Sequence, residues 1–382
     1  MAIYKIFPSQ DASIYSFYPD MNTGIDPILE VGNLNLNINP VPEVFRALVK
    51  FDQDEIDNVL VNKITNSDYQ ANLKLFIAEA QGIIFDTYIE VAPISGSWNN
   101  GSGTYLDSPY TTNGVSWNYK DYEDGTLWPT GSLNSYVTAS YTSSLEGGGN
   151  WFTGSTDPIN TNILVTQSFS QRSYKDLNVD VTSIIEVWNT SSLNLGDDWT
   201  NIENNGFIIK FEDAVEFSTV EATQPILQLY AVDTNTIYPP VLEFKWDDSV
   251  YSSSLTEIYD EELYIALDNN PGTYYSESIN RFRLNVRPKF PPKTYQTSSV
   301  YTNNYKLNSG SMYAIKDLDT NEFIIDFDPT YTKISADDKG NYFDIYMNGL
   351  QPERNYKILI QTTISGSTIV EDNDYNFKVI NG

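Results

Sequence analysis

The stretch "YAVDTNTIYPPVLEFKWDD", residues 230–248, indicates how this chain is built. In its second half, large apolar side chains alternate with Glu243 and Lys245, which is the period-two pattern of a β-strand. Two prolines precede this strand, and the acidic, serine-rich segment 247–262 follows it, as expected of a linker. We therefore expect a strand that closes one domain, with the boundary after Asp248 and with Tyr238 and Trp246 in packing roles.

The same alternation recurs along the chain and predicts an all-β protein. Each of these runs places apolar side chains on one face and polar ones on the other, as in antiparallel sheets. Gly, Pro, Asn, Asp and Ser separate the runs, as in β-sandwiches. We expect one antiparallel sandwich in residues 1–248 and a smaller Ig-like or fibronectin-like sandwich in residues 249–382. The runs are "NLKLFI" (72–77), "RFRLNVR" (281–287), "NYFDIYMNG" (341–349) and "YNFKV" (375–379).

One segment, "NVDVTSIIEVWN" (178–189), has the periodicity of a helix instead. Its apolar residues lie at spacings i, i+3, i+4 and i+7, on one helical face. Asp180, Thr182 or Ser183 would cap the start, and Ser183 with Glu186 has the spacing of a capping box. We predict one short helix packed on the first sandwich. Its apolar face consists of Val181, Ile184, Ile185 and Trp188.

Residues 96–160 form a long insertion rich in Gly, Ser, Thr and Asn. Long loops of this kind are usually functional or flexible. Trp98, Trp117, Trp128 and Trp151 are spread through it, and aromatic area this large is normally fixed to something. We predict an exposed aromatic surface that binds either another protein or, by stacking of indole rings on sugar rings, a glycan.

Composition limits the available chemistry. The chain has 382 residues with 51 acidic and 22 basic side chains, and the net charge of −29 disfavours nucleic-acid binding and anionic membranes. Because cysteine and histidine are absent, disulfides, zinc–thiolate sites and histidine-based catalytic triads are excluded. We expect no cofactor and no catalytic residue. The N-terminal residues "MAIYKIFPSQDAS" have no apolar signal segment, which favours synthesis in the cytoplasm.

Two acidic motifs leave further possibilities open. Asp317, Asp319, Asn321 and Asp328 have some of the spacing of a calcium loop, but Glu322 stands where that loop needs glycine, which favours a turn entering a strand. We therefore predict no metal site there. A glycoside hydrolase with a carboxylate pair also remains possible, although no pair stands out among so many acidic residues.

The order of motifs over residues 1–248 resembles the DNRLRE-type β-sandwich, a jelly-roll module of surface proteins and of structural proteins in tailed phages. No single motif is specific, and the resemblance depends on their order. It implies a jelly-roll-like first domain and carries over no catalytic residue. The motifs are "DASIYS" (11–16), "RALVKFD" (46–52), "NLKLFIAEA" (72–80), "IEVAPISGSWNNGSGTY" (89–105), "GVSWNY" (114–119), "DVTSIIEVW" (180–188), "NNGFIIKFED" (204–213) and "LQLYAVDTNTIYPPVLEFKWDD" (227–248).

The resemblance implies a non-enzymatic structural protein of a tailed-bacteriophage virion, in its tail, baseplate or neck. Such a protein is made in the host cytoplasm, docks on other virion proteins and is present in several symmetric copies. A carbohydrate-binding adhesin is the alternative, and a glycoside hydrolase is the third possibility.

Overall fold

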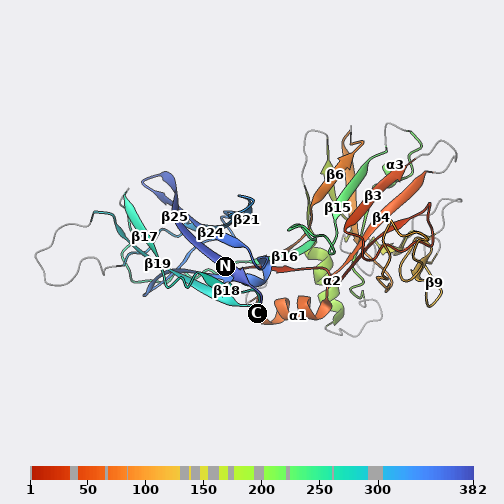
Figure 1. The fold of residues 1–382 in the computed structure, drawn as a ribbon. Coiled ribbons are helices and arrows are strands. Elements are labelled where there is room, and N and C mark those ends of the chain that lie inside the picture. Colours follow the sequence, from red (N-terminus) through yellow and green to blue (C-terminus); the bar gives the residue numbers. More distant parts are fainter. Residues whose placement is uncertain are drawn as a thin grey trace, which may run out of the picture. The chain divides into compact units, whose positions relative to one another are not determined.

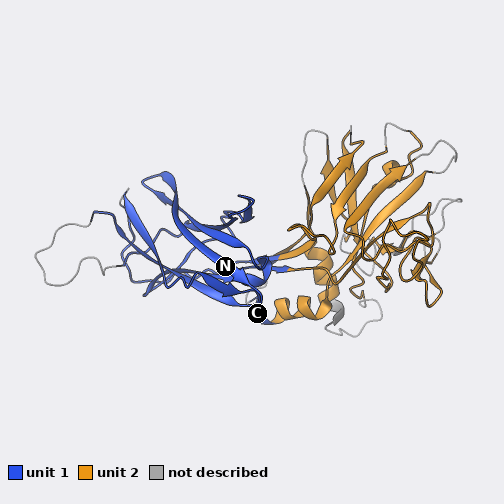
Figure 2. Ribbon diagram, viewed as in Figure 1, with its two compact units in different colours: residues 1–5, 62–69, 244–382 blue, residues 6–61, 70–243 orange. Residues whose placement is uncertain are grey.

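The computed structural model contains two compact units, which Figure 2 shows in different colours. Unit 1 comprises Met1–Lys5, Asn62–Tyr69 and Phe244–Gly382, and unit 2 comprises Ile6–Val61 and Gln70–Glu243. The division falls inside the strand that the sequence placed before the boundary, and two short segments from the N-terminal part belong to unit 1. The structure describes residues 2–34, 42–64, 68–83, 85–129, 137–138, 147–153, 163–170, 176–192, 202–220, 224–259, 262–290 and 304–382.

Unit 2 is built on a large antiparallel sheet with the order β12-β7-β14-β4-β3-β15-β6, in which β2 also pairs with β4 (Figure 1). Along each strand, side chains either alternate between buried and exposed positions or are buried on both faces, and the apolar ones form the core of the unit. The bounds are β2 Gln10–Tyr15, β3 Ile28–Leu34, β4 Glu43–Lys50, β6 Ile77–Gln81, β7 Thr87–Pro93, β12 Val165–Phe169, β14 Phe207–Phe211 and β15 Ile226–Tyr230.

A four-stranded sheet has the order β1-β16-β5-β13, with β1 Ala2–Ile6, β5 Tyr69–Leu75, β13 Leu177–Asp180 and β16 Val241–Trp246. β16 is the strand in the opening motif, and it is central in its sheet. Trp246 is fully buried, and Tyr238 in the preceding turn is half-buried against Phe76 and Tyr230. "NLKLFI" is not one strand as predicted, because the chain leaves β5 at Phe76 and enters β6 of the larger sheet.

The predicted helix is present as α2, Thr182–Ser192, and the four residues predicted as its apolar face are buried, although Val181 lies one residue before the helix. Asp180 accepts hydrogen bonds from the backbone N–H and the hydroxyl of Thr182 at 2.9 and 2.6 Å, so it fixes the start of the helix. Two further helices were not predicted: α1, Gln53–Asn62, and α3, Asp213–Glu216. None of the helices in the described part of the chain has the length and apolar character to span a lipid bilayer.

Unit 1 contains two sheets that enclose one core, as expected for a β-sandwich. Their orders are β17-β19-β23-β22 and β18-β25-β24-β20-β21. Phe282, Phe343 and Tyr313 stack in this core, whereas the arginines of β19 lie on the opposite face, as the alternation predicted. The bounds are β17 Leu263–Asp268, β18 Thr273–Tyr275, β19 Ile279–Pro288, β20 Met312–Asp317, β21 Phe323–Ile325, β22 Ser335–Asp337, β23 Gly340–Tyr346, β24 Asn355–Ile364 and β25 Ser367–Ile380.

The all-β fold is therefore confirmed, with antiparallel pairing throughout the large sheet of unit 2. Unit 1 departs from a purely antiparallel arrangement at β18, which pairs in parallel with the end of β25. The insertion adds the short hairpin pairs β8 Tyr119–Asp121 with β9 Thr126–Leu127, and β10 Val137–Thr138 with β11 Trp151–Phe152. Outside these strands, its described part is mostly irregular, as the gold segment around β9 in Figure 1 shows.

Candidate functional site

The four tryptophans of the insertion do not form an exposed surface, which corrects the prediction. Trp98, Trp117, Trp128 and Trp151 are only 6%, 2%, 2% and 3% exposed. All four belong to a core cluster with side chains of the β-sheet such as Ile14. Their indole faces are therefore not available to stack on a sugar or a partner protein. Burial of this much aromatic area fixes the insertion to the sandwich instead.

Hydrogen bonds and cationic side chains hold these rings in place. The indole N–H of Trp98 donates to the carbonyl of Asn205 at 2.8 Å, and that of Trp128 donates to the carbonyl of Ser116 at 3.0 Å. The Arg46 guanidinium lies over the rings of Trp117 and Trp151, at 5.0 and 5.3 Å from their centroids. These distances are within the range of cation–π attraction, which strengthens when the cation is shielded from water.

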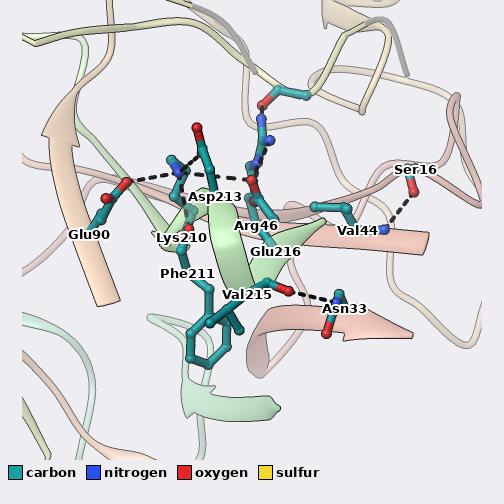
Figure 3. A network of polar contacts seen from close by, with 11 residues as sticks. Ser16, Asn33, Val44, Arg46, Glu90, Lys210, Phe211, Asp213, Val215 and Glu216 are labelled. Carbon is teal, nitrogen blue, oxygen red and sulfur yellow. Dashed lines mark hydrogen bonds and ion pairs between the residues drawn. The ribbon is translucent and has the colours of Figure 1, made fainter. Parts of the chain in front are cut away.

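Arg46 belongs to a buried charge network beneath the insertion, shown in Figure 3. It lies on β4, and its Nε and Nη2 donate to the two carboxylate oxygens of Glu216 at 2.7 and 2.9 Å. Both side chains are 0% exposed. The remaining Nη1 donates to the carbonyl oxygen of Gly148 in the insertion. The guanidinium thus joins the sheet, α3 and the insertion.

Lys210 on β14 is the second cation of the network and is also buried. Its Nζ contacts Glu90 at 2.8 Å, Asp213 at 2.7 Å and Glu216 at 3.9 Å, and it lies 5.2 Å from the centroid of the Trp151 ring. Burial alone would lower the pKa of Lys210, but Glu216, Asp213 and Glu90 outweigh this and raise it above its ordinary value. The ammonium group therefore remains charged.

The glycines of "GGGN" (147–150) allow the insertion to approach the network closely. Gly147, Gly148 and Gly149 all have positive φ angles, which residues other than glycine rarely adopt. A Cβ atom on Gly148 would lie 2.6 Å from the Trp117 ring and 2.8 Å from Nη1 of Arg46. Only a residue without a side chain fits between these groups. The glycine run is therefore explained by packing.

The charge network has the character of a structural element. Glu90, Asp213 and Glu216 all lie within 4 Å of Nζ of Lys210, which makes these carboxylates relevant to the glycosidase hypothesis. However, Glu216 is occupied by Arg46, and Glu90 is occupied by Lys210. Glycoside hydrolysis needs two carboxyl groups that face each other across a gap for the substrate or water. Here each carboxylate faces a cation instead.

A second part of the insertion, residues 100–114, is held by one buried asparagine. The Asn22 amide donates to the carbonyls of Asn100 and Val115 at 2.7 and 2.8 Å. Its side-chain oxygen accepts from the backbone N–H of Gly103 at 2.8 Å. The segment "GSWNNGSG", which has some of the composition of a phosphate-binding loop, is thus organised around Asn22. The loop is therefore fixed by a residue that is distant in sequence, since Asn22 and Gly103 are 81 positions apart.

This loop and Tyr18, which follows β2, together present a group of exposed aromatic side chains that we call the tyrosine surface. It consists of Tyr18, Tyr105, Leu106 and Tyr110, which are 42%, 41%, 88% and 45% exposed. Tyr18 lies between the other two tyrosines, with ring centroids 6.3 Å from Tyr105 and 6.2 Å from Tyr110. The buried ring of Tyr15 supports Tyr105 from below, at 5.3 Å.

Hydrogen bonds to two aspartates make the tyrosine surface rigid. Asp107 accepts from the backbone N–H and the hydroxyl of Thr104 at 3.0 and 2.9 Å, and from the hydroxyl of Thr111 at 2.6 Å. The carboxylate of Asp26 accepts from the backbone N–H of Tyr105 at 2.7 Å. The rings are therefore held in place before any partner binds, which lowers the entropic cost of binding.

The tyrosine surface was not predicted from the sequence, although a signal was present. The stretches "FYPD" (17–20) and "TYLDSPYTT" (104–112) place aromatic residues beside Pro, Asp, Ser and Thr, which form turns at the protein surface. Tryptophan has the largest ring and gains most free energy from burial, so a tryptophan-rich segment does not by itself indicate an exposed surface.

The residues of the calcium hypothesis have other partners. Asp317 ends β20 and is bound at 2.6 and 2.7 Å by Arg354, and it also caps the following turn through the N–H groups of Asp319 and Thr320. Asp328 caps its own turn by accepting from the backbone N–H of Thr330. In the described residues, no group of three or more acidic side chains is arranged to hold a metal ion.

Comparisons with known proteins add little to this site. No protein-family model matches the chain, and a search of curated proteins finds no match. Among solved structures, the chain is similar to a DUF4785 family protein from Legionella pneumophila, with 8% identity and a TM-score of 0.17. That alignment covers 100% of this chain and 62% of the other, so this chain spans less than two thirds of that protein. The resemblance to the DNRLRE-type module stays a prediction from sequence.

Proposed function

We propose that this chain is a non-enzymatic structural protein of a tailed-phage particle that acts by docking on other proteins of the particle. The observation that supports docking is the tyrosine surface, in which Tyr105, Leu106 and Tyr110 of the ordered loop lie beside Tyr18, and all three rings are half-exposed. Tyrosine and other aromatic residues are enriched at protein interfaces, where they contribute large contact area at low entropic cost. The tail, baseplate or neck is where we place it.

The assignment to a phage particle depends on the order of sequence motifs over residues 1–248. Particles of this kind are built by symmetric repetition, which presents one docking surface many times. Many weak contacts then add up to firm attachment, because each new contact after the first is intramolecular. The two sandwiches act in this proposal as a spacer, and the insertion provides the contact.

The amount of the protein in purified particles tests this proposal. Quantitative mass spectrometry of particles purified by density gradient should find the chain in a fixed ratio to the major capsid protein, corresponding to three, six or twelve copies, or a multiple of these. If the particles do not contain the protein, the proposal is wrong.

A carbohydrate-binding adhesin is the second candidate, because exposed tyrosine rings can also stack on sugars. The tryptophans no longer support this candidate, since they are buried. A glycan array probed with the full chain separates the two functions. Binding of one glycan class that is lost when Tyr18, Tyr105 and Tyr110 are changed to serine would favour the adhesin.

A further inference from the structure

We infer that the tyrosine surface binds a cationic protein segment, with arginine side chains stacked on its rings. This inference rests on the proposed docking function and names the chemistry of the partner. It depends on three features: the charge around the rings, the availability of polar groups and the net charge of the chain.

Three carboxylates that form no ion pair among the described residues lie near the tyrosine surface or beneath it. Asp26 holds the backbone of Tyr105, Asp107 lies two residues further along the loop, and Glu30 accepts the hydroxyl of Tyr15 at 2.9 Å. The hydrogen bond from Thr111, followed by those from Thr104, lowers the pKa of Asp107, so this carboxyl group is ionised at neutral pH. Partial burial, and after it the charge of Glu30, raise the pKa of Tyr105, which agrees with a negative local potential.

Negative charge beside aromatic faces is the chemistry that attracts a guanidinium group. Arginine stacks on tyrosine rings by cation–π attraction and pairs with carboxylates at the same time. The protein already uses this combination within unit 1, where Arg281 lies 4.2 Å from the ring centroid of Tyr342 and pairs with Asp344 at 2.8 Å.

A glycan fits the tyrosine surface less well. Sugar recognition needs polar side chains beside the aromatic platform that are free to bind hydroxyl groups. The neutral polar side chains of the loop are already used to hold it: the Asn113 amide donates to the Ser102 hydroxyl at 2.7 Å, and its oxygen accepts from the backbone N–H of Ser102 at 3.0 Å. A second copy of the chain is also disfavoured, because each copy carries a net charge of −29.

Peptide binding to the full-length protein tests the inference. The probe is an eight-residue peptide of alternating arginine and glycine, measured by fluorescence anisotropy at moderate salt, with lysine–glycine and glutamate–glycine peptides for comparison. The test variant is Tyr18→Ser/Tyr105→Ser/Tyr110→Ser. The matched control is Tyr259→Ser/Tyr275→Ser, which removes exposed tyrosines of unit 1 that are 71% and 60% exposed. Neither variant changes the charge.

We expect the arginine peptide to bind the wild type and the control equally, and to bind the test variant about tenfold more weakly, the sum of about 0.5 kcal/mol for each of three rings. The lysine peptide should bind the wild type more weakly than the arginine peptide. Equal binding to the wild type and the test variant would show attraction by net charge only and would overturn the inference. Tyrosine-dependent glycan binding without tyrosine-dependent peptide binding would also overturn it.

The inference and the proposed function can fail separately. If the chain is present in particles but the peptide binds independently of the tyrosines, the docking function stands and the partner is not cationic. If peptide binding depends on the tyrosines but particles lack the chain, the inferred binding chemistry of the surface stands and the proposed presence in a phage particle is wrong. Thermal unfolding of the test variant, monitored by circular dichroism, establishes that it is folded.

Discussion

Arg46 and Glu216 form a bidentate ion pair, with N–O distances of 2.7 and 2.9 Å, in which neither side chain is exposed to solvent. The two residues are 170 positions apart in sequence, so the pair joins β4 to the short helix α3. Burying two charges costs several kcal/mol, which only good geometry and further hydrogen bonds offset. Here Lys210, Gly148 and two tryptophan rings complete the environment of the pair and help to offset this cost.

Glu216→Ala should therefore strongly destabilise unit 2. The change leaves the Arg46 guanidinium buried without its carboxylate, which typically costs about 3–5 kcal/mol. The matched control is Asp344→Ala, which breaks the more exposed Arg281–Asp344 pair of unit 1 and should cost no more than about 1 kcal/mol. Urea unfolding of both variants measures the difference. Equal effects would mean that the buried network contributes no more than a surface ion pair.

Gly148→Ala tests how closely the insertion packs on this network. Alanine would be strained by the φ angle of +78° and would place its Cβ against Trp117 and Arg46. Gly125→Ala is the control, because Gly125 has a similar φ of +66° but no atom within 4 Å of the added Cβ. We expect about 1 kcal/mol of destabilisation for the control and about 1–3 kcal/mol more for Gly148→Ala. Equal losses of unfolding free energy would show that the contact is loose.

Local patterns in the sequence were sufficient to predict much of this fold. The alternation in β19 and the helical spacing of α2 are properties of a few neighbouring residues, and they predicted both elements and their buried faces. Helix α1 was missed because only Ile56 and Val59 are buried in a mostly polar segment, and the helix starts at an Asp52 cap that resembles an ordinary turn residue. The passage from β5 to β6 at Phe76 was also hidden in one continuous apolar pattern.

The candidate site depended on contacts that no local pattern reveals. The composition of residues 96–160 predicted a loop, but not that Asn22 and Arg46 would fix it from distant positions in the sequence. The tryptophans were therefore expected at the surface and are in fact in the core. The glycine run 147–149 was part of this expected loop, and each of its glycines accommodates close packing.

Asp11 gives stability a pH dependence that the absence of histidine did not predict. It is buried on β2, its carboxylate accepts from the backbone N–H of Val232 at 2.6 Å, and burial raises its pKa to about 7. Because the folded state holds this proton more tightly than the unfolded state, the group contributes stability at low pH that is lost as pH rises through about 7.

Between pH 5.5 and pH 8, this group should lower the free energy of unfolding by on the order of 2 kcal/mol. Unfolding of the wild type in urea at both pH values measures the loss, and Asp11→Asn should remove most of it. If the free energy of unfolding changed equally in the wild type and in the variant between the two pH values, Asp11 would not be the source of the pH dependence. Below about pH 4, stability should fall again, because Arg283 and other hydrogen bonds lower the pKa of Asp337 to about 2.

Trp188 anchors α2 to the core and should be sensitive to truncation. Its ring is buried and lies 4.9 Å from that of Phe207 on β14. Trp188→Ala should cost about 3–5 kcal/mol. Trp188→Phe should cost much less, because the indole N–H has no hydrogen-bond partner among the described residues. Melting temperatures of the two variants check this order, and an unchanged value for Trp188→Ala would show that the helix does not depend on this residue.

The central claim is that the tyrosine surface attaches the chain to a phage particle, and incorporation of variants into particles measures this most directly. Particles are assembled with the wild type, with Tyr18→Ser/Tyr105→Ser/Tyr110→Ser, or with the control Tyr259→Ser/Tyr275→Ser, and the copies per particle are counted by quantitative mass spectrometry. We predict full incorporation of the wild type and the control and loss of most copies of the triple variant, provided that it remains folded. Full incorporation of a folded triple variant would contradict the claim.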